Sequence, residues 1–403
     1  LNMKKVILIT TGFLTIHDYK NLEISNYTKN GIKFEIWNFD FLYKLGVNGK
    51  KIYCEILLSN FKHFKELIIK NKKNTLLFDV RTNFNLTSLK IFYYLARHDC
   101  KFILHVGLLR NNLIQYRKKF NFINKIKSIF TKKLLLFIES KIETIFFKLN
   151  LHKFYRLKHA NFVYVIGKKT LQNLKSIALI GPNTQVVKGH HRNYDHYVKL
   201  TNQKKLIKSK NKFAVFIDQG VPIHPDWIKL GLNDVDIDKY YNSLRSFFLK
   251  FEKEFHIKVK ISAHPKINIK RISKYFKGFE TIQGKTLELI YKSKFVIAHD
   301  STAVGFAIFL KKPVLFIIND PLKNSNHNHL NEIKWLASHL QKKVFNIDKV
   351  NIKLLYRELT VDNILYKKYA LNYFKFSKSN LSYSNILIKL SNVIFKKKQK
   401  KLF

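Results

Sequence analysis

Short apolar runs alternate with longer amphipathic segments along most of this chain, a pattern typical of α/β proteins in which helices connect parallel strands. Segments with helical periodicity, such as 86–98, lie between most of the runs in the first half. The runs themselves are expected to form strands: KVILIT (5–10), KFEIWNF (33–39), NTLLFDV (74–80), KFILHV (101–106) and NFVYVIG (161–167). The first half is therefore expected to be an α/β domain.

The alternation restarts after KLTNQKKLIKSKNK (199–212), which has almost no apolar pattern and which we interpret as a linker. Helices are expected over 237–255 and 285–293. The strands expected here are KFAVFIDQG (212–220), IKVKISAHP (257–265), KFVIAHD (294–300) and KPVLFI (312–317). Two Rossmann-like α/β domains facing a cleft, 1–205 and 206–403, account for this pattern and for the chain length.

A basic segment from about 111 to 159 interrupts the first domain. Its apolar residues recur at three- and four-residue steps, for example from Phe122 to Ile138, with lysines between them. This spacing predicts an amphipathic helical insertion. Two interpretations stay open: helices that pack on the core and expose a basic face, or an interfacial segment that inserts Phe and Ile into anionic lipid.

The charge and cysteine content limit the class of partner and the compartment. The chain has 75 Lys and Arg against 26 Asp and Glu, a formal net charge of +49. Such a charge suits nucleic acid, anionic membranes or anionic substrates, but the basic residues form no RNA-binding signature. Cys54 and Cys100 make neither a disulfide framework nor a zinc site. No signal peptide or membrane span is recognisable, so we expect a cytoplasmic protein, peripheral at the inner membrane.

Three polar turns follow expected strands of the second domain. They are Asp218-Gln219-Gly220, His264-Pro265, and the stretch from His299 to Thr302. The carboxyl ends of parallel strands meet at one edge of a sheet, where ligands bind. We therefore expect the three turns to face one space.

Each turn carries a group with possible chemistry. Ser301 and Thr302 precede a predicted helix, where they would either bind a phosphate or cap the helix. His264 is able to donate to a phosphate oxygen or to protonate a leaving group. Asp218 would serve either as a general base or as a turn cap.

Other familiar sites are not expected. The chain lacks both a P-loop and a G-x-G-x-x-G after its first strand. The histidine-rich stretch GHHRNYDH (189–196) does not suit a metal, because adjacent His190 and His191 cannot easily share one tetrahedral centre. No metal site and no bound cofactor are predicted.

The order of these turns resembles a known family. FIDQGVPIHPDW (216–227), a later His-Pro, and HDSTAVGFAIFLKKPVLF (299–316) look like bacterial GT-B glycosyltransferases that use CMP-activated sugars. These are the sialyltransferases, polysialyltransferases and Kdo transferases of capsule and lipopolysaccharide synthesis. The ordered match covers Phe213 to Ile317 only.

The resemblance implies an inverting, metal-independent transfer of a nonulosonic acid or Kdo from a CMP-sugar to a surface glycan. It implies that Asp218 is the base and that His264 contacts the CMP phosphate and acts as general acid. The other residues that it places at the donor are Pro265, Ser301, Thr302, Gly220 and His299.

One departure and three alternatives remain. Gln219 stands where sialyltransferases usually have a second acid, so Asp226, His17 or Asp18 are alternative bases. The His-Pro and Asp-Ser-Thr turns also fit a CDP-glycerol or CDP-ribitol phosphotransferase of the teichoic-acid type. A UDP-sugar enzyme fits less well. A non-enzymatic basic protein that binds RNA or anionic membrane would explain the charge but not the turns.

Overall fold

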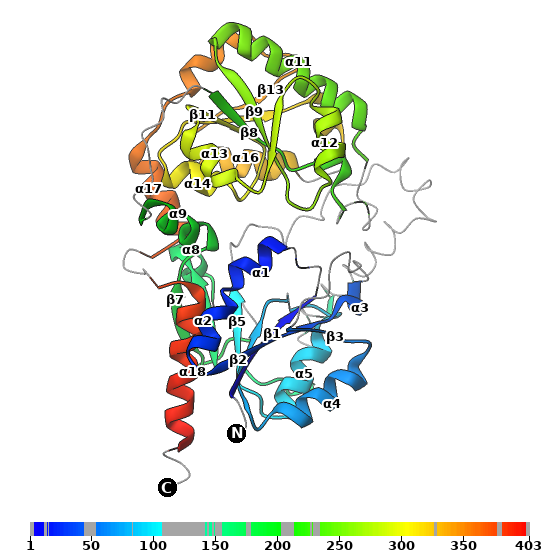
Figure 1. Ribbon diagram of the computed structural model, residues 1–403, viewed down its shortest axis with the longest axis vertical. Helices are drawn as coiled ribbons and strands as arrows, with labels where there is room; N and C mark the ends of the chain where they lie inside the picture. Colours follow the sequence, from blue (N-terminus) through cyan, green and yellow to red (C-terminus); the bar gives the residue numbers. More distant parts are fainter. Residues whose placement is uncertain are drawn as a thin grey trace. The chain divides into compact units, whose positions relative to one another are not determined.

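The computed structural model describes most of the chain, and its parts form two compact α/β units (Figure 1). The predicted helical insertion (111–159) and the later part of the predicted linker (203–212) lie largely outside the described residues. The described ranges are 4–11, 14, 16–43, 54–82, 84–106, 142, 145–146, 149, 155–174, 179–202, 213–225, 228, 234–325, 329–376 and 381–399.

The first unit has a seven-stranded parallel sheet in the order β3-β2-β1-β4-β5-β6-β7. All five strands predicted for the first half are present. The strands are β1 (Lys4–Thr10), β2 (Ile32–Asn38), β3 (Glu55–Leu57), β4 (Thr75–Val80), β5 (Phe102–Val106), β6 (Phe162–Ile166) and β7 (Gln185–Gly189).

Helices cover both faces of this sheet (Figure 1). Alternate β1 residues enter different cores: Ile7 and Ile9 pack with α4 and α5, whereas Val6 and Leu8 pack with α2 and α18. The strands are thus buried on both faces, which explains their continuous apolar runs. The helices of this unit are α1 (Ile16–Leu22), α2 (Ile24–Lys29), α3 (Asp40–Tyr43), α4 (Phe61–Asn71), α5 (Leu89–Arg97), α8 (Gly167–Gln172) and α18 (Tyr383–Gln399).

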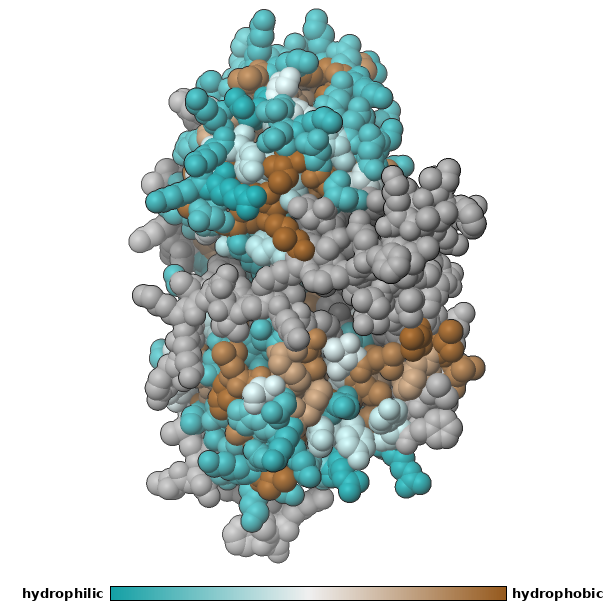
Figure 2. Space-filling model, turned by 90° about the vertical axis from the view of Figure 1, so that its right-hand side faces the viewer, coloured by the Kyte–Doolittle hydropathy of each residue, from teal (hydrophilic) through white to brown (hydrophobic). Residues whose placement is uncertain are grey.

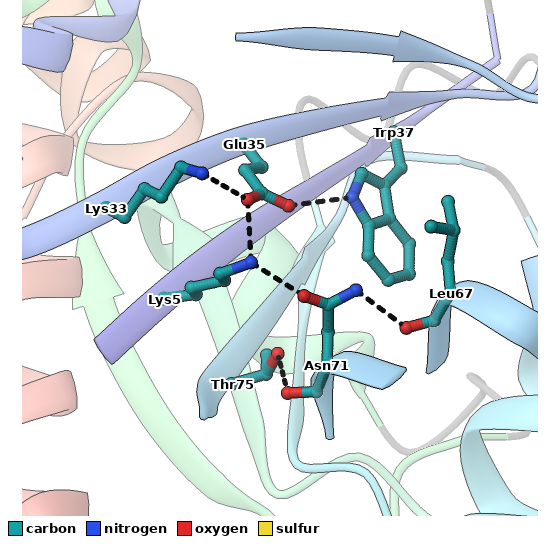
Figure 3. Close-up of polar contacts among 7 residues, drawn as sticks. All are labelled: Lys5, Lys33, Glu35, Trp37, Leu67, Asn71 and Thr75. Atoms are coloured by element: carbon teal, nitrogen blue, oxygen red, sulfur yellow. Dashed lines mark hydrogen bonds and ion pairs between the residues drawn. The ribbon is translucent and has the colours of Figure 1, made fainter. Parts of the chain in front are cut away.

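An ion cluster around the buried Glu35 carboxylate joins β1, β2 and α4 toward the amino end of β1 (Figure 3). Lys5 Nζ lies 2.8 Å from the Glu35 carboxylate and donates to Asn71 at 2.6 Å. Trp37 Nε1 donates to the other Glu35 oxygen at 3.2 Å. Burial opposes the ionisation of Glu35, but the hydrogen bonds from Lys5 and Lys33 outweigh it and lower the pKa of this carboxyl. The cluster therefore holds two neighbouring strands and a helix of the first unit together.

The second unit has a six-stranded parallel sheet in the order β10-β9-β8-β11-β12-β13. Successive strands extend from β8 to one side and from β11 to the other, so the order reverses between β8 and β11. The four strands predicted for the second half are all present. The strands are β8 (Phe213–Ile217), β9 (Lys258–Ala263), β10 (Glu280–Gln283), β11 (Phe295–Ala298), β12 (Val314–Ile318) and β13 (Val344–Asn346).

The longest helix of this unit, α11, shows how local sequence sets an element. Asp236 caps it by accepting from the Lys239 amide at 3.0 Å, and a buried aromatic stripe from Tyr240 to Phe251 faces the sheet. The left-handed conformation of His256 ends it. The remaining helices are α9 (Arg192–Asn202), η4 (Val221–Ile223), α12 (Ile269–Tyr275), α13 (Thr286–Lys292), α14 (Val304–Phe309), α15 (Asp320–Asn324), α16 (His329–His339), η5 (Ile352–Glu358) and α17 (Asn363–Tyr373).

The division of the chain differs from the one predicted near residue 205. Among the residues that the structure describes, the second unit begins at His191, and Lys375–Phe403 returns to the first unit. Helix α9, which includes the start of the predicted linker, packs against α14 of the second unit. Helix α18 buries Leu387 in the core of the first unit. Tertiary packing, not sequence order, therefore sets the boundary.

The described surface is mixed in character. On the face in Figure 2, hydrophilic residues cover much of the described surface and apolar groups lie between them. Within the described ranges, no helix combines the length and the apolar character needed to cross a bilayer.

Candidate functional site

The three polar turns follow three adjacent strands of the second unit. Ile217, the last residue of β8, pairs with Ser262 of β9 and with Ala298 of β11. Asp218 and His299 therefore begin neighbouring turns, and His264 begins the third. The prediction that these turns share one sheet edge is confirmed.

The first and third turns flank the point where the strand order reverses. In a doubly wound sheet, a ligand crevice opens at this point, outside the carboxyl ends of the strands. The Asp300 amide donates to Oε1 of Gln219 at 3.3 Å, so a side chain from one turn bridges to the backbone of the other. In the sequence, Gln219 stands out only as a departure from the second acid that sialyltransferases usually have. In the structure, its side chain has a defined place at this edge.

Asp218 is buried, with 2% of its surface exposed. Its Oδ1 accepts from the Gly220 amide at 2.9 Å, the geometry of a turn cap. Its Oδ2 is also buried and makes no hydrogen bond within the described part of the chain. Burial raises the pKa of Asp218 to about 7, although the Gly220 amide opposes the shift. A carboxyl with this pKa exchanges protons near neutral pH, as a general base must.

Gly220 is required for two physical reasons. Its φ of +58° lies in the left-handed region, and a Cβ placed there would be 1.7 Å from Cδ1 of Ile267. Ile267 follows the His264-Pro265 turn, so this contact packs the first turn against the second. Gly220 holds the backbone of the site; its predicted contact with a donor stays a prediction.

The second turn fixes the orientation of a half-buried histidine. Gln283 Nε2 donates to the backbone oxygens of His264 and Ile267, each at 2.7 Å. The Lys266 amide donates to Nδ1 of His264 at 3.3 Å. Because Nδ1 accepts, the neutral ring carries its proton on Nε2. This proton suits donation to an anion, and Pro265 beside it is exposed.

His224 is a site residue that the sequence analysis missed. It lies just after η4, is 8% exposed, and its ring packs T-shaped against His264 with centroids 4.7 Å apart. The HP pair at 224–225 repeats the HP pair at 264–265. That repetition was the only local signal for a second histidine at this edge.

His299 does not have the geometry expected of a phosphate ligand. It is fully buried, its Nδ1 donates to the Ile317 carbonyl at 2.7 Å, and its Nε2 bonds the Tyr240 hydroxyl at 2.9 Å. Both ring nitrogens are therefore engaged in the core, with Phe216 packed against the ring. We correct its assignment from ligand contact to core support.

Ser301 and Thr302 lie between β11 and α14. Helix α14 has six residues, begins at Val304, and has Ala303 as its N-cap residue, which makes no side-chain bond. Ser301 Oγ accepts from the Ala303 amide at 3.2 Å, which leaves its O–H to donate. Thr302 is exposed, and its carbonyl accepts from Asn193 at 2.8 Å. Ser301 therefore caps the turn that leads into α14, in line with the cap alternative, and phosphate binding stays a prediction.

Several other candidates fall outside this cluster. Asp226 lies outside the described residues, as does the side chain of His17, while Asp18 belongs to α1 of the first unit. Among the residues that the structure describes, no three His, Cys, Asp or Glu side chains gather as a metal site. His191 Nδ1 accepts from the Asn193 amide, a local structural bond.

Two parallel Rossmann-like sheets, each in its own unit, define a GT-B-like α/β protein. No family model and no curated protein matches the sequence. Solved structures are similar at low identity. The UDP-GlcNAc 2-epimerase of Methanocaldococcus jannaschii, in complex with UDP-GlcNAc and UDP, is 12% identical with a TM-score of 0.48, over 98% of this chain and 100% of that one.

Two further solved structures show similar coverage. Acinetobacter baumannii MurG is 10% identical with a TM-score of 0.41, over 98% of this chain and 95% of that one. Arabidopsis thaliana UGT89C1 is 8% identical with a TM-score of 0.44, over 98% and 94%. These likenesses concern the fold, so we base the proposed function on the residues of the site.

Proposed function

We propose that this chain is an inverting glycosyltransferase that transfers a nonulosonic acid or Kdo from a CMP-sugar to a surface glycan. One observation carries the proposal: Asp218, His264 and the Ser301-Thr302 pair end three adjacent strands at one sheet edge. The choice of CMP as the nucleotide comes from the resemblance over Phe213–Ile317.

The proposed step forms a bond between the acceptor oxygen and the anomeric carbon while the bond from that carbon to the phosphate oxygen breaks. Asp218 takes the acceptor proton, for which its pKa of about 7 is suitable. His264 donates from Nε2 to the departing phosphate, and the hydroxyls of Ser301 and Thr302 bind the same group. Neutral donors of this kind stabilise negative charge that develops on a leaving phosphate.

The acceptor and the place of action follow from the same proposal. A lipid-linked or surface glycan as acceptor would bring the enzyme to the inner face of the cytoplasmic membrane. The net charge of +49 favours contact with anionic lipid there. The protein would then be cytoplasmic and peripheral to the membrane.

The second candidate is a CDP-glycerol or CDP-ribitol phosphotransferase. The observation that favours it is a His-Pro pair followed later by Asp-Ser-Thr: the first comes directly after β9 and the second lies in the turn after β11, the two strands on either side of β8. In that reaction the acceptor oxygen would bond to the β-phosphorus while the bond from that phosphorus to the bridging oxygen breaks, so the polyol phosphate would be transferred and CMP would leave. A non-enzymatic basic protein would instead bind nucleic acid with a steep salt dependence.

The test is a thermal-shift panel of CMP, CDP-glycerol, UMP and GMP. A ligand at one hundred times its Kd adds about 2.7 kcal/mol to stability, so CMP should raise the melting temperature well beyond UMP or GMP. His264→Ala should abolish transfer from a CMP-sugar, while His256→Asn, at an exposed histidine of the same unit, should not. Full turnover by the His264 variant would refute the site, and consumption of CDP-glycerol but not CMP-sugars would favour the second candidate.

A further inference from the structure

Gln219 joins the two turns that flank the reversal of strand order in the second unit. It follows Asp218 at the end of β8, whereas Asp300 lies in the turn after β11, and the two strands are hydrogen-bonded neighbours. The Asp300 amide donates to Gln219 Oε1 at 3.3 Å. The side-chain amide of Gln219 therefore lies at the edge where such a sheet binds its ligand.

The bond from the Asp300 amide determines which end of the Gln219 side-chain amide is the oxygen. A backbone N–H only donates, so the atom facing Asp300 must be the side-chain oxygen and the NH₂ group must be the other end. Gln219 is half-exposed, and its NH₂ group donates to no acceptor in the described part of the chain. Two N–H donors thus stand beside the reversal point.

The groups around Gln219 include both donors and acids. The Ser301 hydroxyl keeps its O–H in the same turn as Asp300. Asp218 and Asp300 are both buried, and the pKa of about 7 leaves Asp218 protonated in a large share of molecules at neutral pH. A second acid at position 219 would add negative charge to this edge, whereas an amide adds donors and no charge.

We propose that the NH₂ group of Gln219 donates a hydrogen bond to a phosphate oxygen of the bound nucleotide, so that Gln219 selects phosphorylated nucleosides over unphosphorylated ones. The inference rests on the proposed nucleotide site and assigns a contact within it. It also gives Gln219 a role that an acid at this position could not perform.

The experiment measures the Kd of CMP and of cytidine by calorimetry for the wild type, Gln219→Glu and Gln219→Met. Glutamate keeps an acceptor for the Asp300 amide and replaces the donor with a charge; methionine removes both the donor and that acceptor without adding charge. CMP affinity should fall at least about tenfold in the glutamate variant and severalfold in the methionine variant, the range of one charge-assisted hydrogen bond. Cytidine affinity and melting temperature should stay at wild-type values in Gln219→Glu.

Gln341→Glu is the matched control, because Gln341 is exposed in the same unit and follows α16 before β13 begins. It should bind CMP as the wild type does. If Gln219→Met binds CMP as tightly as the wild type, the inference is overturned. The loss of affinity in Gln219→Glu would then come from the added negative charge and not from the missing donor. Equal losses for CMP and cytidine would also overturn it. Failure of the wild type to bind any nucleotide would instead refute the proposed function itself.

Discussion

The rings of His224 and His264 pack T-shaped with their centroids 4.7 Å apart at the carboxyl edge of the second sheet. His224 is buried and His264 is half-buried, so the His224 ring supports one side of the His264 ring. The Lys266 amide donates to Nδ1 of His264, so the neutral ring carries its proton on Nε2. We therefore expect His224 to position the proposed general acid.

Replacing His224 should affect catalysis through this support. His224→Ala removes the packed ring, and we expect kcat to fall at least about tenfold with a smaller change in KM, because a misoriented acid costs transition-state stabilisation. His224→Phe keeps a ring in the same place and should restore most of kcat. Steady-state kinetics with a CMP-sugar measure both; an alanine variant with wild-type kcat would contradict the prediction.

Asp218 should make stability depend on pH. Its pKa is about 7 in the folded chain against an ordinary value of 3.8, so between these values the folded chain binds more protons than the unfolded chain. The contribution is fully present below about pH 4 and is lost as the pH rises through about 7. Each unit of pKa shift corresponds to about 1.4 kcal/mol, which makes the total on the order of a few kcal/mol.

Urea unfolding between pH 4.5 and 8 checks this prediction. The free energy of unfolding of the wild type should decrease with rising pH relative to Asp218→Asn, which cannot ionise. Asp238→Asn, at an exposed aspartate of the same unit, should keep the wild-type slope. Identical slopes for the wild type and Asp218→Asn would show that Asp218 ionises as an exposed carboxyl does.

Gly220→Ala should lower the stability of the second unit by more than the cost of placing alanine in a left-handed backbone conformation. A left-handed φ costs a non-glycine residue about 1–2 kcal/mol, and here the new Cβ also meets Cδ1 of Ile267. Gly284→Ala is the control, because Gly284 has a φ of +77° and no atom near its absent Cβ. Chemical denaturation should show the larger loss for Gly220→Ala, and Ile267→Val, which removes Cδ1, should recover part of it. Equal losses at the two glycines would exclude the contact with Ile267.

The C-terminal helix should depend on one buried hydroxyl. Tyr383 Oη donates to Asp79 Oδ1 at 2.7 Å, and the Arg81 guanidinium lies 4.7 Å from the centre of the Tyr383 ring. Tyr383→Phe leaves part of the buried Asp79 carboxylate unsatisfied and should cost about 1–3 kcal/mol. Tyr356→Phe removes a hydroxyl from an exposed ring and should cost little.

Hydrogen exchange followed by mass spectrometry reports on this helix directly. The α18 amides should exchange faster in Tyr383→Phe than in the wild type, because a weaker attachment opens more often. The Tyr356 variant should match the wild type. Unchanged exchange in α18 would mean that apolar packing through residues such as Leu387 is sufficient to hold the helix.

The strands that the sequence pattern missed share one property. They are β3, β7, β10 and β13, which are the edge strands of the two sheets. A central parallel strand is buried on both faces and reads as a continuous apolar run, whereas an edge strand such as β7 keeps several exposed residues. The periodicity signal therefore identifies the interior of each sheet but not its borders.

Local sequence alone determined the central strands, the long helix α11 and the presence of three polar turns after strands of one sheet, because these depend on apolar runs, caps and strand direction. The tertiary structure decided the rest. It buried His299 in the core, placed His224 against His264, bridged Gln219 to Asp300, and returned α18 to the first unit. Each of these joins residues or elements distant in the sequence, or depends on which way a side chain turns after its strand ends. Only strand order and close packing settle such contacts.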